Sequence, residues 1–292
     1  MRQPLRWNFR AAATASGLCL VLLSPSRAQE PSGGDAQKAI RAVDNSVSAA
    51  YELLHVYYAE PSDGAVAGPN YDAEDGTLSD GGMVAASMMR SFGSWRDVFA
   101  QASFSRATGQ LPYDGHLQLT IPPITIPLRG SSGARINDWS FRLGMGVETG
   151  EGWLWTPYLA YGYHTWARTL PGGGFVSSYV ENYSHSALQI GNRVQYAPSP
   201  RVVLTADGRF GTTVAPHIVV PADQLDQNLG SAPIIDLEVE ADYALRGPLH
   251  VFAGWRYSRF GYGQSGVSGG ILEPVSTTEL MSALAGLRYS FR

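Results

Sequence analysis

The chain of 292 residues has one cysteine, Cys19, and one lysine, Lys38. A single thiol cannot form a disulfide within the chain, so strand pairing and packing must hold the fold. The scarcity of lysine and the formal net charge of −4 argue against nucleic-acid binding. Outside the N-terminus no apolar run reaches about 18 residues, so the sequence predicts no transmembrane helix.

The first 28 residues have the parts of a cleavable signal peptide. Arginines come first, residues 11–23 are apolar, and Ser26-Arg27-Ala28 is a small-x-small cleavage site. Cleavage there removes the cysteine and leaves a more acidic exported chain. Residues 29–45 then form a periplasmic lead-in, either disordered or with one or two helical turns over 36–43, ahead of the main domain at 46–292.

The stretch 235–245 alternates strictly between apolar and acidic residues. Ile235, Leu237, Val239, Ala241, Tyr243 and Leu245 share one parity, and Asp236, Glu238, Glu240 and Asp242 share the other. Successive side chains of a strand point to opposite faces, so this segment has one apolar and one acidic face. The apolar face either packs on a second sheet or faces lipid.

Ten segments have strand character, and the connections between them alternate between short and long. The segments are 46–58, 82–92, 97–107, 136–148, 153–167, 182–197, 200–213, 234–245, 249–262 and 277–291. The long connections are 59–81, 108–135, 168–181, 214–233 and 263–276. Short turns at one end and long loops at the other are typical of an outer-membrane barrel, with the turns in the periplasm. We therefore predict an all-β fold: a single antiparallel transmembrane β-barrel of about ten strands.

Charges of both signs occupy the parity opposite the apolar residues. A sandwich would turn this face to bulk water, where its signs need not balance, whereas a closed barrel lets the charges pair across a lumen. The predicted lumen network is Arg142, Glu148, Arg193, Asp207, Arg209, Asp236, Glu238, Glu240, Asp242, Arg256 and Arg288.

Aromatic residues gather near both ends of the predicted strands, as they do at the two interfaces of a bilayer. The short-turn girdle comprises Trp95, Trp153, Trp155, Tyr196, Tyr243, Tyr289 and Phe291, and the long-loop girdle comprises Tyr57, Tyr58, Trp139, Trp166, Phe260 and Tyr262.

The C-terminal run Leu287-Arg288-Tyr289-Ser290-Phe291 resembles the closing strand of bacterial outer-membrane proteins, although Arg292 follows the terminal aromatic. The run 250–262 is similar to strands of small proteobacterial outer-membrane barrels of unassigned role. The resemblance implies an outer-membrane location and recognition of the last strand by the barrel assembly machinery. Outer-membrane lipid and lipopolysaccharide are then the expected surroundings, and an envelope protein is a further partner.

Some barrels of this size are enzymes, including omptin-like proteases and lipid-modifying enzymes. The neighbours His185 and Ser186 point to opposite faces of a strand, so they cannot act as a base and nucleophile. His164 and Asp207 lie at opposite heights of the predicted lumen. The six histidines have no metal-ligand spacing. We predict no catalytic residue, no cofactor and no metal site.

The connection 108–135 is apolar for an outer loop. Its candidate contact residues are Leu117, Leu119, Ile121, Ile124, Ile126 and Leu128. They form either a proline-punctuated flap on the barrel mouth or a contact for lipid, an apolar solute or a partner. Pro157 cannot donate to a strand ladder, so pairing should be interrupted there.

Ten strands leave a closed or very narrow lumen. The expected function is therefore a non-enzymatic structural or surface-interaction barrel. The alternatives are a narrow channel or transporter for small or apolar solutes, and an outer-leaflet lipid enzyme or omptin-like protease.

Overall fold

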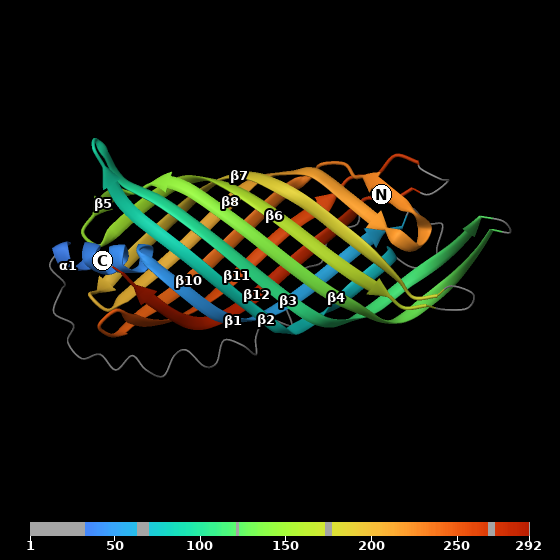
Figure 1. Cartoon of the computed structure of the whole chain (residues 1–292), viewed down its shortest axis with the longest axis horizontal. Helices are drawn as coiled ribbons and strands as arrows, with labels where there is room; N and C mark the ends of the chain where they lie inside the picture. Colours follow the sequence, from blue (N-terminus) through green and yellow to red (C-terminus); the bar gives the residue numbers. More distant parts are fainter. Residues whose placement is uncertain (1–32, 63–69, 121–122, 173–176, 268–271, 292) are drawn as a thin grey trace, which may run out of the picture.

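A computed structural model describes residues 33–62, 70–120, 123–172, 177–267 and 272–291, and the signal-peptide prediction lies outside them. One antiparallel sheet closes into a barrel, with a helix at one end (Figure 1). The elements are α1 (Gly33–Asp44), β1 (Ser46–Pro61), β2 (Asn70–Phe92), β3 (Trp95–Thr120), β4 (Pro123–Met145), β5 (Val147–Gly150), β6 (Trp153–Leu170), β7 (Tyr179–Ser199), β8 (Val202–Val220), the 3-10 turn η1 (Pro221–Asp223), β9 (Leu225–Asn228), β10 (Pro233–Arg246), β11 (Leu249–Tyr262) and β12 (Ser276–Ser290).

The barrel has ten wall strands, which confirms the predicted fold. The sheet contains twelve strands, of which β5 continues β4 and β9 pairs with the outer end of β8. The ring closes where β1 pairs with β12 and where β8 pairs with β10. Among the described residues no helix is long and apolar enough to cross a membrane.

The alternation of 235–245 sets the orientation of β10. Ile235, Leu237 and Val239 are about half exposed on the outer wall. The acidic residues of the same stretch turn inward, and Asp242 among them is buried. The same arrangement recurs on β12, where Leu287 and Tyr289 are exposed and Arg288 between them is buried. Apolar side chains therefore face outward in a band around the barrel, as lipid requires.

The turn end of the barrel has the predicted tight connections. Gly93 and Gly247 adopt φ of +60° in the turns after β2 and β10, a conformation that glycine reaches without steric cost. The ladder between β4 and β6 is interrupted opposite Pro157, because β4 stops pairing at Gly144 and β5 resumes at Val147. The missing amide of the proline accounts for this break.

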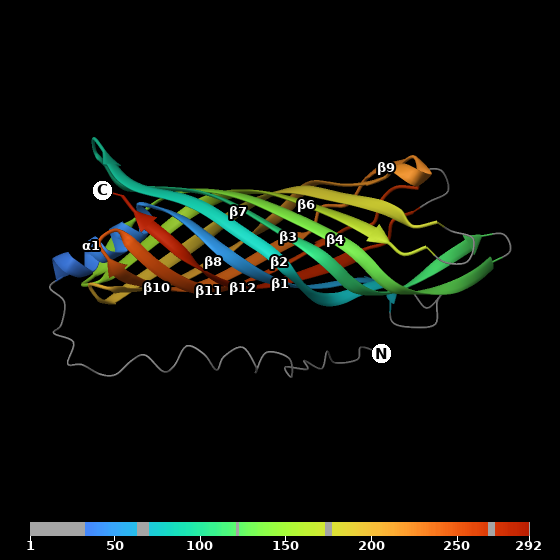
Figure 2. The same ribbon diagram turned by 60° about the horizontal axis from the view of Figure 1, so that its bottom comes forward.

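Strands extend into several of the predicted long outer loops: most of the described residues of 59–81, 108–135 and 214–233 are strand, whereas the described part of 263–276 connects β11 to β12. The connection 108–135 is a paired hairpin: β3 and β4 stay in register from Val98↔Met145 to Thr120↔Pro123. This hairpin projects beyond the rest of the barrel (Figures 1 and 2). Leu117 pairs with Ile126 and Leu119 with Ile124 in its backbone ladder, and Ile121 lies outside the described residues. Leu128 is buried in a cluster with Tyr113 and Leu170.

The polarity of the wall inverts beyond the apolar band. Inside the outer extension, Leu78, Leu111, Ile136 and Ile218 are fully buried and form one apolar core. Water surrounds this part of the barrel, so its interior is packed like that of a soluble protein. Because the strands lose their outward apolar pattern here, the sequence alone predicts loops for these residues.

The lead-in is also more ordered than its sequence suggested. Residues Gly33–Asp44 form a helix of 12 residues that covers the short-turn end of the barrel (Figure 2). Its apolar stripe, Ala36, Ile40 and Val43, packs on lumen residues of the wall such as Phe99 and Leu154. The helix therefore packs into this end of the lumen, and a cleft of about 1290 Å³ remains between it and wall residues such as Met89 and His250.

Candidate functional site: a sealed lumen

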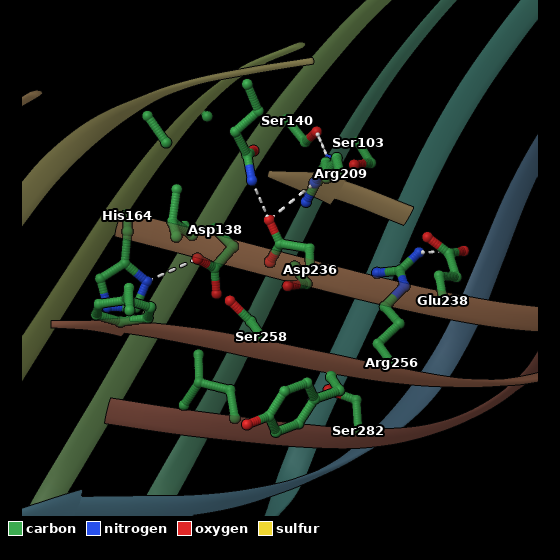
Figure 3. Close-up of a pocket in the computed structure, with 18 of the residues that line it drawn as sticks. Ser103, Asp138, Ser140, His164, Arg209, Asp236, Glu238, Arg256, Ser258 and Ser282 are labelled. Atoms are coloured by element: carbon green, nitrogen blue, oxygen red, sulfur yellow. Dashed lines mark hydrogen bonds and ion pairs between the residues drawn. The ribbon is translucent and has the colours of Figure 1, made fainter. Parts of the chain in front are cut away.

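The centre of the lumen is spanned by arginine–carboxylate pairs. The Arg142 guanidinium lies 3.1 Å from Asp207 on one side and 3.1 Å from Glu238 on the other. Arg256 lies 3.3 Å from the second oxygen of Glu238 (Figure 3). Arg142 has a side chain only 8% exposed, so this pairing replaces the water that the charges have lost. The chain of contacts joins β4, β8, β10 and β11.

A second group of charges lies at the same height. Arg209 Nε is 2.9 Å from Asp236, and its Nη1 donates to Ser140 Oγ at 2.9 Å (Figure 3). Gln189 Nε2 also donates to Asp236. These contacts satisfy the hydrogen-bonding capacity of the Asp236 carboxylate and fill the space beside the central pairs.

Closer to the short turns, Arg288 lies between two carboxylates. It is 2.8 Å from Glu240 and 2.6 Å from Asp242, which also accepts a bond of 2.6 Å from His250 Nδ1. Below this group Arg193 Nη1 donates to Asp44 at 2.6 Å. Asp44 ends α1, so this ion pair fastens the helix to the wall.

The structure brings ten of the eleven residues of the predicted network into the lumen. Glu148 lies elsewhere: its side chain is 48% exposed on β5 and lies 2.8 Å from Arg41 of α1. Sequence reasoning missed Asp44, which belongs to a segment expected to be a lead-in. It also missed Gln189, a neutral residue on the inward parity of β7.

A polar cavity of about 120 Å³ lies in the upper lumen (Figure 3). Asp138, His164 and Glu52 line it together with serines from several strands. His164 Nδ1 is 2.7 Å from Asp138, while its Nε2 is buried without a hydrogen-bond partner among the described residues. The pair resembles the orienting half of a base–nucleophile arrangement, but no hydroxyl reaches the free nitrogen.

An aromatic layer separates this cavity from the outer surface. Tyr58 and Trp166 meet edge to face with centroids 5.2 Å apart, and Tyr183 stacks on Tyr262 at 5.5 Å. Phe260 packs against the histidines below. The long-loop girdle is therefore partly wrong: Tyr58, Trp166, Phe260 and Tyr262 are buried in the barrel. Each of the four has the same parity as the lumen-facing residues of its strand, so the alternation in the sequence could have placed them inside the barrel.

Above the aromatic layer, and beyond the apolar band, Arg168 is fully buried among carboxylates. It lies 2.8 Å from Glu181, 3.3 Å from Glu74 and 3.8 Å from Asp72. Its guanidinium also stacks 4.3 Å above the ring of Tyr58. We refer to Arg168, Glu181, Glu74 and Asp72 as the mouth cluster.

The mouth cluster and its neighbours hold more negative than positive groups. Glu60 accepts a hydrogen bond from Tyr58, and Glu273 accepts one of 2.5 Å from Tyr183. Burial raises the pKa of Glu181 to about 8, against the opposing attraction of Arg168. Burial and the charge of Asp72 raise the pKa of Glu60 well above its ordinary value. Protonated carboxyls thus relieve the charge excess at neutral pH.

Metal binding has no support among the residues that the structure describes, where no group of three or more His, Cys, Asp and Glu side chains could hold an ion. Two further histidine–carboxylate pairs in the outer half have exposed carboxylates: His217 lies 2.6 Å from Asp226, and His55 lies 3.2 Å from Asp75.

Comparison with solved structures identifies the architecture. The outer-membrane protease OmpT from Escherichia coli superposes with a TM-score of 0.53 and 10% identity, over 85% of this chain and 97% of OmpT. The fold is that of a bacterial outer-membrane β-barrel. The translocator domain of the autotransporter NalP from Neisseria meningitidis gives a TM-score of 0.41 at 13% identity, over 88% of this chain and 96% of NalP. A deletion mutant of the monoaromatic hydrocarbon channel TodX gives a TM-score of 0.36 at 8% identity, over 88% of this chain and 93% of the TodX chain.

Searches by sequence add no relative. No known family description matches the chain. No curated protein matches it either. The likeness to OmpT shows the fold, and what this barrel does has to be argued from its own residues.

Proposed function

We propose that this chain is a closed, non-conducting and non-enzymatic outer-membrane barrel that presents a rigid outer extension for interaction with an envelope or surface partner. One observation supports the closed lumen above all others. Side chains cross the lumen at successive heights: α1 with Asp44, the charge network around Arg142, the aromatic layer and the mouth cluster. An ion would have to break several buried ion pairs to pass.

The outer extension supports the interaction role. A strand needs about 9–11 residues to cross the hydrocarbon, whereas β3 has 26 and β4 has 23. The remainder is paired and packed on its own apolar core. Building such a core outside the membrane gives the barrel a fixed surface, which is what a binding platform requires.

Planar-bilayer recording of the purified protein tests the closed lumen. We expect no steady unitary current from the wild type or from a variant lacking residues 33–43, because the layers above α1 remain in place. Steady currents from the wild type would overturn the proposal. Currents from the deletion variant alone would show that α1 is the gate and that the charge network does not seal.

The Asp138–His164 pair makes an enzyme the second candidate. Its imidazole is 4% exposed beneath the aromatic layer, so a peptide or lipid has no path to it in this conformation. Incubation with labelled peptide, phospholipid and lipid A should give no turnover. Turnover lost in His164→Ala and retained in His217→Ala would establish an enzyme and remove our proposal.

Assembly and surroundings follow from the same architecture. Tyr289 and Phe291 at the end of the chain are exposed on the outer wall, next to the seam between β12 and β1. We propose that the assembly machinery recognises this strand, and that lipopolysaccharide surrounds the outer half of the apolar band.

A further inference from the structure

The lipid-facing wall has a groove at its short-turn half, across β7, β8, β10 and β11. It has a volume of about 610 Å³. Its floor consists of the small side chains Ala206, Ala241 and Ala253. Register places Ala241 beside Ala253 and Ala206 beside Val239, so the small residues lie together on neighbouring strands.

Two aromatic stacks rise on either side of this floor. Trp153 stacks on Tyr196 with centroids 4.4 Å apart, and Trp255 stacks on Tyr257 at 6.1 Å. Within the hydrocarbon an unfilled groove would forfeit the dispersion contacts of its lining. A slot with an alanine floor and aromatic walls fits an acyl chain.

Two arginines lie at the turn end of the same strands. Arg201 accepts a backbone hydrogen bond of 2.8 Å from Ala244, which brings the β7–β8 turn beside the end of β10. A register shift pairs Arg246 with Leu249, a residue exposed on the lipid side. Neither arginine has an ion pair among the described residues, and their two turns contain no Asp or Glu.

The spacing between the arginines and the groove matches a phospholipid. Ala206 lies five residues beyond Arg201, and Ala241 lies five before Arg246. At about 3.3 Å per residue both arginines stand roughly 16 Å along the strands from the groove floor. A phosphate at the level of the arginines would therefore place its acyl chains in the groove.

We propose that this groove binds one anionic phospholipid of the periplasmic leaflet, with its phosphate on Arg201 and Arg246 and an acyl chain over Ala206, Ala241 and Ala253. Cationic side chains at the membrane surface attract anionic head groups, and two of them convert a general lipid contact into a selective one. A second copy of this chain fits less well, because the aromatic stacks of two copies would meet before their floors. The proposal rests on the fold and not on the proposed function.

Native mass spectrometry of the delipidated full chain, with phosphatidylglycerol or phosphatidylethanolamine added at equal concentration, tests it. We expect one retained phosphatidylglycerol and at least tenfold weaker retention of phosphatidylethanolamine. The double variant Arg201→Gln, Arg246→Gln should bind both lipids equally weakly. Ala241→Phe should lose retention of both lipids, because the ring fills the groove.

Matched changes on the opposite wall are the controls. The pair Arg90→Gln, Arg96→Gln removes two exposed arginines from the β2–β3 turn region, and Ala102→Phe adds a ring to the outward face of β3. Both should leave phosphatidylglycerol retention unchanged. Equal retention of the two lipids by the wild type, or an equal loss in the control arginine pair, would overturn the proposal. A stable dimer that excludes lipid would also overturn it.

Discussion

Replacing Arg168 by methionine should loosen the outer mouth while the membrane-spanning wall stays folded. Methionine retains much of the side-chain volume but removes the cation of the mouth cluster. Glu181, Glu74 and Asp72 have side chains no more than 14% exposed, so each would keep its burial and lose its cationic partner, although tyrosine hydroxyls still donate to Asp72 and Glu181. Removing one member of a buried ion pair typically costs about 3–5 kcal/mol.

Protonation sets the lower limit of this cost. Neutral carboxyls avoid the charge penalty but leave buried polar groups without partners, at about 1–3 kcal/mol each. We therefore expect Arg168→Met to destabilise the outer extension by about 3 kcal/mol at neutral pH. The wall below it has its own ladders and its own charge network, so the effect should stay local.

Hydrogen exchange resolved by peptide measures the prediction. Amides at the outer ends of β2, β6 and β7 should lose protection in Arg168→Met, and those of β10 and β12 should not change. Arg259→Gln is the control, because its ion pair with Glu279 is 3.5 Å long and its side chain is 49% exposed. Exposed pairs contribute about 0–1 kcal/mol. Wild-type protection in Arg168→Met, or equal losses in both variants, would refute our reasoning.

Three further outcomes follow. Because the folded-state pKa of Glu181 is about 8, above its ordinary value of 4.5, protection of the mouth should fall as pH rises from 4.5 to 8. Glu181→Gln should reduce this fall, and an unchanged pH profile would contradict the assignment. Asp44→Ala leaves Arg193 buried and unpaired, so α1 should become protease-sensitive, while Asp35→Ala on the exposed face should have no effect. Val239→Arg should cost about 2–4 kcal/mol of insertion free energy, read from heat-modifiable migration. Val267→Arg lies in an exposed outer connection and should leave the insertion free energy unchanged.

The membrane-spanning half of the barrel could be predicted because its pattern is local. Side chains of a strand alternate with a period of two, so the exposed Leu237 and the inward Glu238 are distinguishable from their sequence positions alone. The tight turns after β2 and β10 contain glycine at positive φ, which also marks strand ends without knowledge of the fold. Strand number, closure and the composition of the charged lumen follow from these features.

Tertiary structure decided which charges meet and where the membrane pattern stops. Asp44 and Arg193 are 149 residues apart, and the residue pattern around neither of them indicates that they meet. Strand tilt and stagger determine which residues share a height, and these are properties of the closed ring. The outer extension eluded prediction because its surroundings change from lipid to water. The apolar side chains of a strand such as β1 then turn from the outer wall, as at Leu53, to the interior, as at Val56.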